Sequence, residues 1–154
     1  MDIGYTDAGL VVGLSSGGGG TEFGARFTRG LKRLPQLGNG LLSLGAGVSR
    51  SSYSTSTVVF DQVASTSASS TVLFAAGNYH FPLKNDRIDA FAGAGLYYSI
   101  VSSSSSAGGS AGASAMGLTL RLGGRYFVSD KLAVYGDTGM GGSALNVGVT
   151  MRLR

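Results

Sequence analysis

Cysteine and tryptophan are absent from this 154-residue chain, and histidine occurs once. Without cysteine there is no disulfide framework and no thiol chemistry. A single histidine with scattered acidic residues does not make a credible metal site, because structural and catalytic metals need several convergent ligands. The sequence therefore predicts neither a bound metal nor a cofactor.

Charge is also scarce. Charged residues make up 13% of the chain, with one glutamate, Glu22, and three lysines, Lys32, Lys84 and Lys131. A soluble surface carries roughly 25–35% charged residues, so this chain has few side chains to place in water. No apolar run approaches the ~20 residues of a spanning helix. A transmembrane β-barrel is consistent with both absences.

The chain does have alternation. In LTLRLGGRYF, residues 118–127, the leucines share one parity, while threonine, arginine and glycine share the other. Strict period two indicates a strand with two unlike faces. Similar stretches predict eight strands in one domain spanning 1–154, at residues 8–15, 22–31, 41–53, 70–81, 90–100, 118–127, 132–140 and 144–153.

The connections between these strands are of two kinds that alternate. KRLPQLGNG, PLKNDRI and VSDK hold all three lysines and both prolines, whereas SSGGGGT, residues 51–69 and SSSSSAGGSAGAS are rich in serine, glycine or alanine. An up-and-down barrel with short periplasmic turns and longer outer loops would show this alternation. The apolar segment TVVFDQVA, residues 57–64, is expected to extend its hairpin above the membrane; the alternative is contact with a partner.

Aromatic residues gather next to the charged turns. An interfacial aromatic girdle would place them there, although aromatics flank turns in other β proteins too. The predicted girdle residues are Tyr5, Tyr79, Phe81, Phe91, Tyr126 and Phe127.

The two parities differ enough to predict which face points inward. One parity is Leu, Val, Phe, Ala, Met and Ile, and the other is Gly, Ser, Thr, Asn, Arg and Asp. If the apolar parity faced inward, the outside would be mostly Gly and Ser with little charge. If it faces lipid, the small and polar residues fill the narrow interior of an eight-stranded barrel. The sequence favours the second arrangement.

Pairing of the last strands predicts a polar cluster inside the barrel. A two-residue Gly141-Gly142 hairpin sets Asp137 opposite Asn146. A three-residue turn before Leu132 sets Asp137 opposite Gly123, with Arg121 and Arg125 as diagonal neighbours. A carboxylate between two guanidinium groups would form an interior ion-pair cluster. The predicted lumen residues are Arg26, Arg121, Arg125, Tyr135, Asp137, Asn146 and Arg152.

The stretches DAFAGAGLYYS, LRLGGRYFVSDKLAVYGDTG and ALNVGVTMRLR resemble the small eight-stranded outer-membrane β-barrel proteins of Gram-negative bacteria. The resemblance implies an all-β, eight-stranded antiparallel up-and-down transmembrane β-barrel in the outer membrane. It implies membrane lipid or lipopolysaccharide as a partner, with a surface or envelope protein as a further one. The opening MDIGYTDAGL has neither a basic nor a long apolar region, so we interpret the chain as a mature form.

Three functions remain open. The first is a non-catalytic barrel with a structural, surface-binding or anchoring role. The second is a narrow passive pore lined by Arg26, Arg121, Arg125 and Arg152, and the third is a soluble or self-assembling Gly/Ser-rich surface protein. No enzyme is expected, because His80 is placed at the periplasmic interface and no Ser-His-Asp set is apparent. The basic residues are too dispersed for a nucleic-acid interface.

Overall fold

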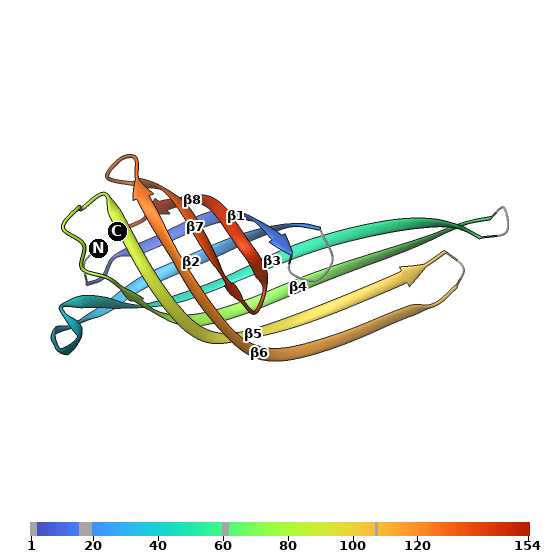
Figure 1. Ribbon diagram of the computed structural model, residues 1–154, viewed down its shortest axis with the longest axis horizontal. Coiled ribbons are helices and arrows are strands. Elements are labelled where there is room, and N and C mark those ends of the chain that lie inside the picture. Colours follow the sequence, from blue (N-terminus) through green and yellow to red (C-terminus); the bar gives the residue numbers. More distant parts are fainter. Residues whose placement is uncertain (1–2, 16–19, 60–61, 107) are drawn as a thin grey trace.

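The computed structural model describes residues 3–15, 20–59, 62–106 and 108–154. Within them eight strands form one closed antiparallel barrel in chain order (Figure 1). No helix in the described part of the chain is both long and apolar enough to cross a membrane. The strands are β1 (Thr6–Ser15), β2 (Thr21–Leu34), β3 (Gly40–Val59), β4 (Gln62–His80), β5 (Ile88–Ser105), β6 (Ser110–Phe127), β7 (Leu132–Met140) and β8 (Ser143–Arg152).

The predicted fold class is confirmed, but the four central strands are much longer than expected. β3 to β6 have 18 to 20 residues each, whereas β1, β7 and β8 have 9 or 10. The serine-rich stretches predicted as loops are mostly paired strand, because the hairpins continue in unbroken register. Residues 57–59 pair with 62–64 and extend the hairpin, as predicted. Phe60, Asp61 and residues 16–19 of the first outer connection lie outside the described residues.

Closure joins the first strand to the last. β1 pairs antiparallel with β8, with Leu10 opposite Val149. The Thr6 N–H donates to the Arg154 carbonyl at 3.2 Å, so the two ends of the described chain meet. Both lie at the end of the barrel that carries the charged turns (Figure 1). The turn from β2 to β3 there includes a short 3-10 helix, η1 (Pro35–Leu37), closed by Gly38 at φ 75°.

The apolar parity faces outward around the whole barrel. In β6, Leu118, Leu120 and Leu122 are exposed, whereas Thr119 and Arg125 are buried. The same outward pattern runs through the other strands. A soluble barrel with an apolar core would require the opposite arrangement, so that alternative is contradicted. The outward apolar residues include Leu10, Val12, Phe23, Phe27, Leu44, Val48, Leu73, Leu96, Val134, Leu145, Val147 and Val149.

Half of the barrel wall continues as a four-stranded sheet beyond the other half. β2 last pairs with β3 at Glu22 opposite Ser51, and β7 pairs with β6 only as far as Met140 opposite Leu120. β3, β4, β5 and β6 run on together from there, and the two long hairpins project from the end opposite the termini (Figure 1). We call residues 52–59, 62–69, 102–106 and 108–112 the extension.

Candidate functional site

The interior of the barrel is polar. Its upper part, meaning the part nearer the extension, is organised around Asp137 on β7. The Asp137 carboxylate accepts hydrogen bonds from Arg26 Nη1 at 3.0 Å, Arg121 Nε at 2.8 Å and Asn146 Nδ2 at 2.8 Å. Arg121 also donates to the Ser143 carbonyl at 3.0 Å. One buried carboxylate on β7 thus binds side chains of three other strands, β2, β6 and β8, and the bonds from the two arginines are charge-assisted and therefore stronger than neutral ones.

The pairing predicted for this region is present. Asp137 lies opposite Gly123 and Asn146, and Tyr135 lies opposite Arg125. Gly141 and Gly142, both at positive φ, make the turn between β7 and β8. Glycine adopts such angles without the penalty that a Cβ would bring.

One expected contact is wrong. Arg125 was expected beside Asp137, but it forms an ion pair with Asp7 of β1 and donates to Thr28 Oγ1 at 3.2 Å. The second guanidinium on Asp137 comes from Arg26 instead. The physical reason is the narrowness of the lumen, because a long side chain reaches strands that are not its neighbours. Register between adjacent strands cannot reveal such a contact.

The lower part of the interior, toward the charged turns, is organised around His80. His80 Nδ1 donates to the Asp89 carboxylate, with distances of 2.8 and 3.0 Å to its two oxygens. His80 Nε2 is hydrogen-bonded to Ser43 Oγ at 2.8 Å, and Asn78 Nδ2 lies 3.5 Å from the same hydroxyl. Arg125 Nη1 is 3.8 Å from Asp89, which links this network to Asp7.

Two expectations about these residues are wrong. His80 is buried inside the barrel rather than at the membrane interface, and Ser43, His80 and Asp89 do form a Ser-His-Asp arrangement. A nucleophile, however, must also reach a substrate. Ser43 is 1% exposed and Leu41, the next inward residue toward the charged turns, is 2% exposed. A hollow of about 170 Å³ at this end touches His80 and Asp89 but not Ser43. The arrangement links β3, β4 and β5 through buried side-chain hydrogen bonds.

Aromatic rings separate the two networks. The Phe91 and Tyr135 rings are stacked with centroids 5.9 Å apart, and the Arg26 guanidinium carbon lies 3.8 Å above the Tyr135 ring. A cation over an aromatic face is attracted by the quadrupole of the ring. Glycine at position 123 leaves the room for this layer, because a Cβ there would lie 2.7 Å from Phe91 Cζ and 2.6 Å from Asp137 Cβ.

The girdle prediction is wrong for part of its set. Tyr5 and Phe91 are buried in the barrel, at 2% and 1% exposure. Phe127 has the inward parity of Arg125 and meets the Tyr5 ring edge-on at 6.4 Å. Phe81 and Tyr126 are exposed on the outside, and Tyr79 is half-buried there with its hydroxyl donating to the Leu37 carbonyl. Aromatic content near a turn does not reveal the face of the strand.

Arg152 of the predicted lumen set is at the edge of the site. It is exposed at the end of β8, with its guanidinium carbon 5.3 Å from the centroid of the Tyr5 ring and its Nε donating to the Arg154 carbonyl. It lines a hollow of about 420 Å³ beside the turn between β6 and β7. It does not join either network among the described residues.

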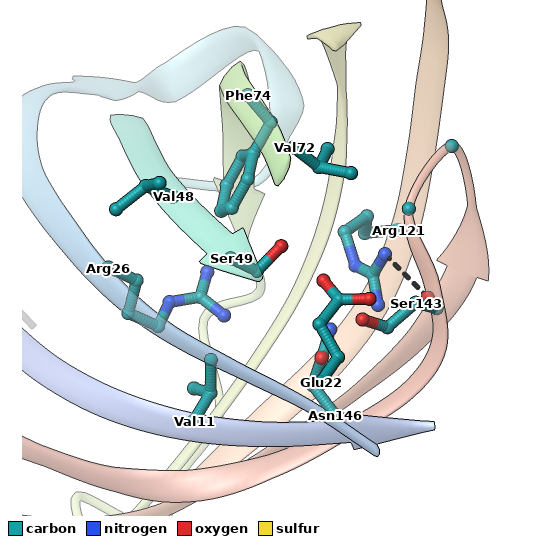
Figure 2. Close-up of a pocket in the computed structure, with 12 residues that line it drawn as sticks. Val11, Glu22, Arg26, Val48, Ser49, Val72, Phe74, Arg121, Ser143 and Asn146 are labelled. Atoms are coloured by element: carbon teal, nitrogen blue, oxygen red, sulfur yellow. Dashed lines mark hydrogen bonds between the residues drawn. The ribbon is translucent and has the colours of Figure 1, made fainter. Parts of the chain in front are cut away.

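Little open space remains in the upper interior. The cavity above Arg26 and Arg121 has a volume of about 20 Å³, and Glu22, Asn146 and Ser143 border it (Figure 2). That is room for about one water molecule, since a water needs roughly 10–15 Å³ by this measure. A larger hollow of about 510 Å³ lies over the extension, bordered by Tyr53 and by serines of β3, β4 and β5. Among the described residues, no group of three or more His, Cys, Asp or Glu could hold a metal ion.

Several interior residues escaped the sequence analysis. They share the inward parity of their strands, which is the signal that could have found them. Asp7 and Asp89 lie just outside the predicted strands 8–15 and 90–100. The buried residues missed are Asp7, Thr28, Ser43, Asn78, His80, Asp89 and Thr119.

Comparison with known proteins supports the fold. No family model matches the chain, and no curated protein matches it. Among solved structures, the N-terminal β-barrel domain of Pseudomonas aeruginosa OprF has a TM-score of 0.63 at 12% identity, covering 99% of this chain and 100% of that one. Yersinia pestis Ail in complex with the heparin analogue sucrose octasulfate has a TM-score of 0.58 at 11% identity, covering 96% and 93%. Neisserial surface protein A has a TM-score of 0.55 at 16% identity, covering 96% and 93%. The chain thus has the fold of small eight-stranded outer-membrane β-barrels.

Proposed function

We propose that this chain is an integral outer-membrane protein without catalytic activity, whose barrel is closed by its polar interior and holds the extension at the cell surface. The observation that carries the proposal is the inverted distribution of side chains. Large apolar residues face out and ionised residues face in, an arrangement that lipid stabilises and water does not. The charged turns and the chain ends would then lie on the periplasmic side.

The interior supports a closed barrel better than a pore. Asp137 joins Arg26 and Arg121 across the upper lumen, while the stacked Phe91 and Tyr135 rings lie below them. A conducting pathway would need these buried ion pairs to part, which leaves charges unpaired in a low-dielectric interior. An arginine-lined anion pore is therefore the weaker alternative.

The extension supports a surface-binding role. It consists of paired strands that project from one side of the barrel rather than of short turns (Figure 1). Ail, which shares the fold, is seen with a sulfated sugar analogue. For this chain we propose contact with the envelope through the wall and the extension, with lipopolysaccharide as the glycolipid partner.

The membrane location can be tested with single cysteines, because the chain has none of its own. Leu120→Cys and Ser104→Cys both place a label on the outer side, the first within the apolar belt and the second in the extension. In vesicles with brominated acyl chains, we expect quenching of a fluorophore at position 120 and not at 104. Thr119→Cys, adjacent but buried, should resist labelling. Equal quenching of the fluorophore at positions 120 and 104 would contradict a lipid-facing belt.

Whether the side chains block the lumen can be tested by conductance. The folded chain, identified by a boiling-dependent shift on an SDS gel, is added to a planar bilayer in salt solution. We expect no discrete channel openings, because the two networks and the aromatic layer fill the lumen. Tyr135→Ala, which removes a central ring, serves as the variant that opens the interior. Stable openings of the unaltered chain would favour the pore.

A further inference from the structure

The outer face of β3 to β6 changes character abruptly where the barrel becomes the extension. Neighbouring residues across the four strands form rows, defined by the strand pairing. The last fully apolar row is Val48, Leu73, Tyr98 and Met116, all exposed. The next is Arg50, Thr71, Ile100 and Ser114. The two beyond it are Ser52, Ser69, Ser102 and Gly112, then Ser54, Ser67, Ser104 and Ser110.

Rows on one face are about 7 Å apart, because alternate residues of a strand are separated by twice its rise. The face therefore passes from hydrocarbon-like to hydroxyl-covered within about two rows. The exposed hydroxyls form a regular array, with Ser54 Oγ 3.1 Å from Ser67 Oγ and Ser56 Oγ 3.1 Å from Ser65 Oγ. They retain further hydrogen-bonding capacity, since each hydroxyl can both donate and accept.

Arg50 marks the boundary. It is exposed, lies next to outward Phe23 of β2, and makes no ion pair or side-chain hydrogen bond with any residue that the structure describes. The other described charges at this end of the barrel are on the inward parity: Glu22, Arg26, Arg121 and Asp137. A single outward guanidinium at the edge of an apolar belt suits a phosphate, which it can bind with two parallel hydrogen bonds.

We infer that this outer face, continuous with the lipid-facing belt, binds the phosphorylated saccharide headgroup of lipopolysaccharide, with Arg50 on a phosphate and the serine rows on the sugars. The inference rests on the proposed outer-membrane function. The chemical groups of lipopolysaccharide, taken from the membrane outward, follow the same order as the side chains on this face. The acyl chains would lie against Val48 and Leu73, the phosphate at Arg50, and the sugar hydroxyls at Ser69 and Ser102. Because only β3 to β6 continue beyond the rest of the barrel wall, the glycolipid is held on one side of the barrel.

The experiment uses the folded full-length chain in detergent and counts bound glycolipid by native mass spectrometry during titration. The probes are purified lipopolysaccharide with its core sugars, lipid A without them, and phosphatidylglycerol. Arg50→Gln should lower the affinity for the first two about tenfold, since a charge-assisted hydrogen bond is lost. The double variant Ser69→Ala with Ser102→Ala should lower affinity about tenfold only for the probe that carries core sugars.

The matched control is the double variant Ser70→Ala with Ser103→Ala, on the same strands but the opposite face, and it should bind like the unaltered chain. An unchanged affinity of Arg50→Gln would overturn the inference, as would equal losses in the two serine pairs. Phosphatidylglycerol bound as tightly as lipopolysaccharide would reduce the site to a general phosphate contact. Dimers that form without glycolipid and are lost in the Ser69 and Ser102 variant would assign the face to a second copy. Unquenched label at position 120 would instead defeat the membrane proposal itself, which separates the two failures.

Discussion

The barrel interior and the extension are built from the same small residues, yet these residues act differently in the two regions. On β6, a Cβ at Gly123 would lie 2.6 Å from the Gly136 carbonyl oxygen and 2.7 Å from Phe91, whereas a Cβ at Gly112 would meet only the Val101 carbonyl oxygen, at 3.7 Å. Ser43 in the interior is hydrogen-bonded to a buried histidine, while Ser67 in the extension bonds another exposed serine. Burial, not residue type, therefore decides how much each position contributes to stability.

The largest expected effect is in the interior. Asp137→Asn leaves Arg26 and Arg121 buried without their counter-charge, which should lower the free energy of unfolding by roughly 3–5 kcal/mol. The measurement is urea unfolding in lipid vesicles, followed by the gel shift of the folded barrel. Asp130→Asn, in an exposed turn, is the matched control and should leave the midpoint in place. A stable Asp137→Asn barrel would mean that the network contributes little.

The glycine pair on β6 gives the most direct comparison of the two regions. Gly123→Ala should cost about 1–3 kcal/mol, since Asp137, Phe91 and the Gly136 backbone must all shift. Gly112→Ala should stay within about 0.5 kcal/mol of the unaltered chain. Both are measured by the same urea titration. Equal losses of unfolding free energy in the two variants would show that the extension is as tightly packed as the lumen.

The smallest effect is expected for the serine pair. Ser43→Ala removes one buried hydrogen bond from His80 and should cost about 1 kcal/mol. Ser67→Ala, which loses an exposed bond to Ser54, should cost less than about 0.5 kcal/mol. Thermal shifts of the gel transition would rank the two. A larger loss for Ser67 would indicate that the hydroxyl array stabilises the extension.

Parity predicted most of the fold and only part of the site. The alternation of Leu118, Leu120 and Leu122 revealed the outward face, and the Gly141-Gly142 turn set the register of Asp137. Apart from the hairpin expected at residues 57–64, the extension was missed because serine and alanine resemble a linker when no apolar alternation marks the strand. His80 and its partners were missed because the alternation around His80 is weak and Asp89 fell outside the predicted strand 90–100. In the register of the structure, Ser43 and Asp89 are diagonal neighbours of His80 on the two adjacent strands.

The contact between Thr6 and Arg154 makes the chain suitable for circular permutation, in which the two ends are joined and the chain is opened elsewhere. A short linker between the two ends would add little strain, because the backbones there already touch. The chain could then be opened between Val59 at the end of β3 and Gln62 at the start of β4, well beyond Ser51, where the pairing of β3 with β2 ends. Such a circular permutant keeps all eight barrel pairings, and its new ends follow β3 and precede β4. The order in which the strands are connected is thus separable from the barrel that they form.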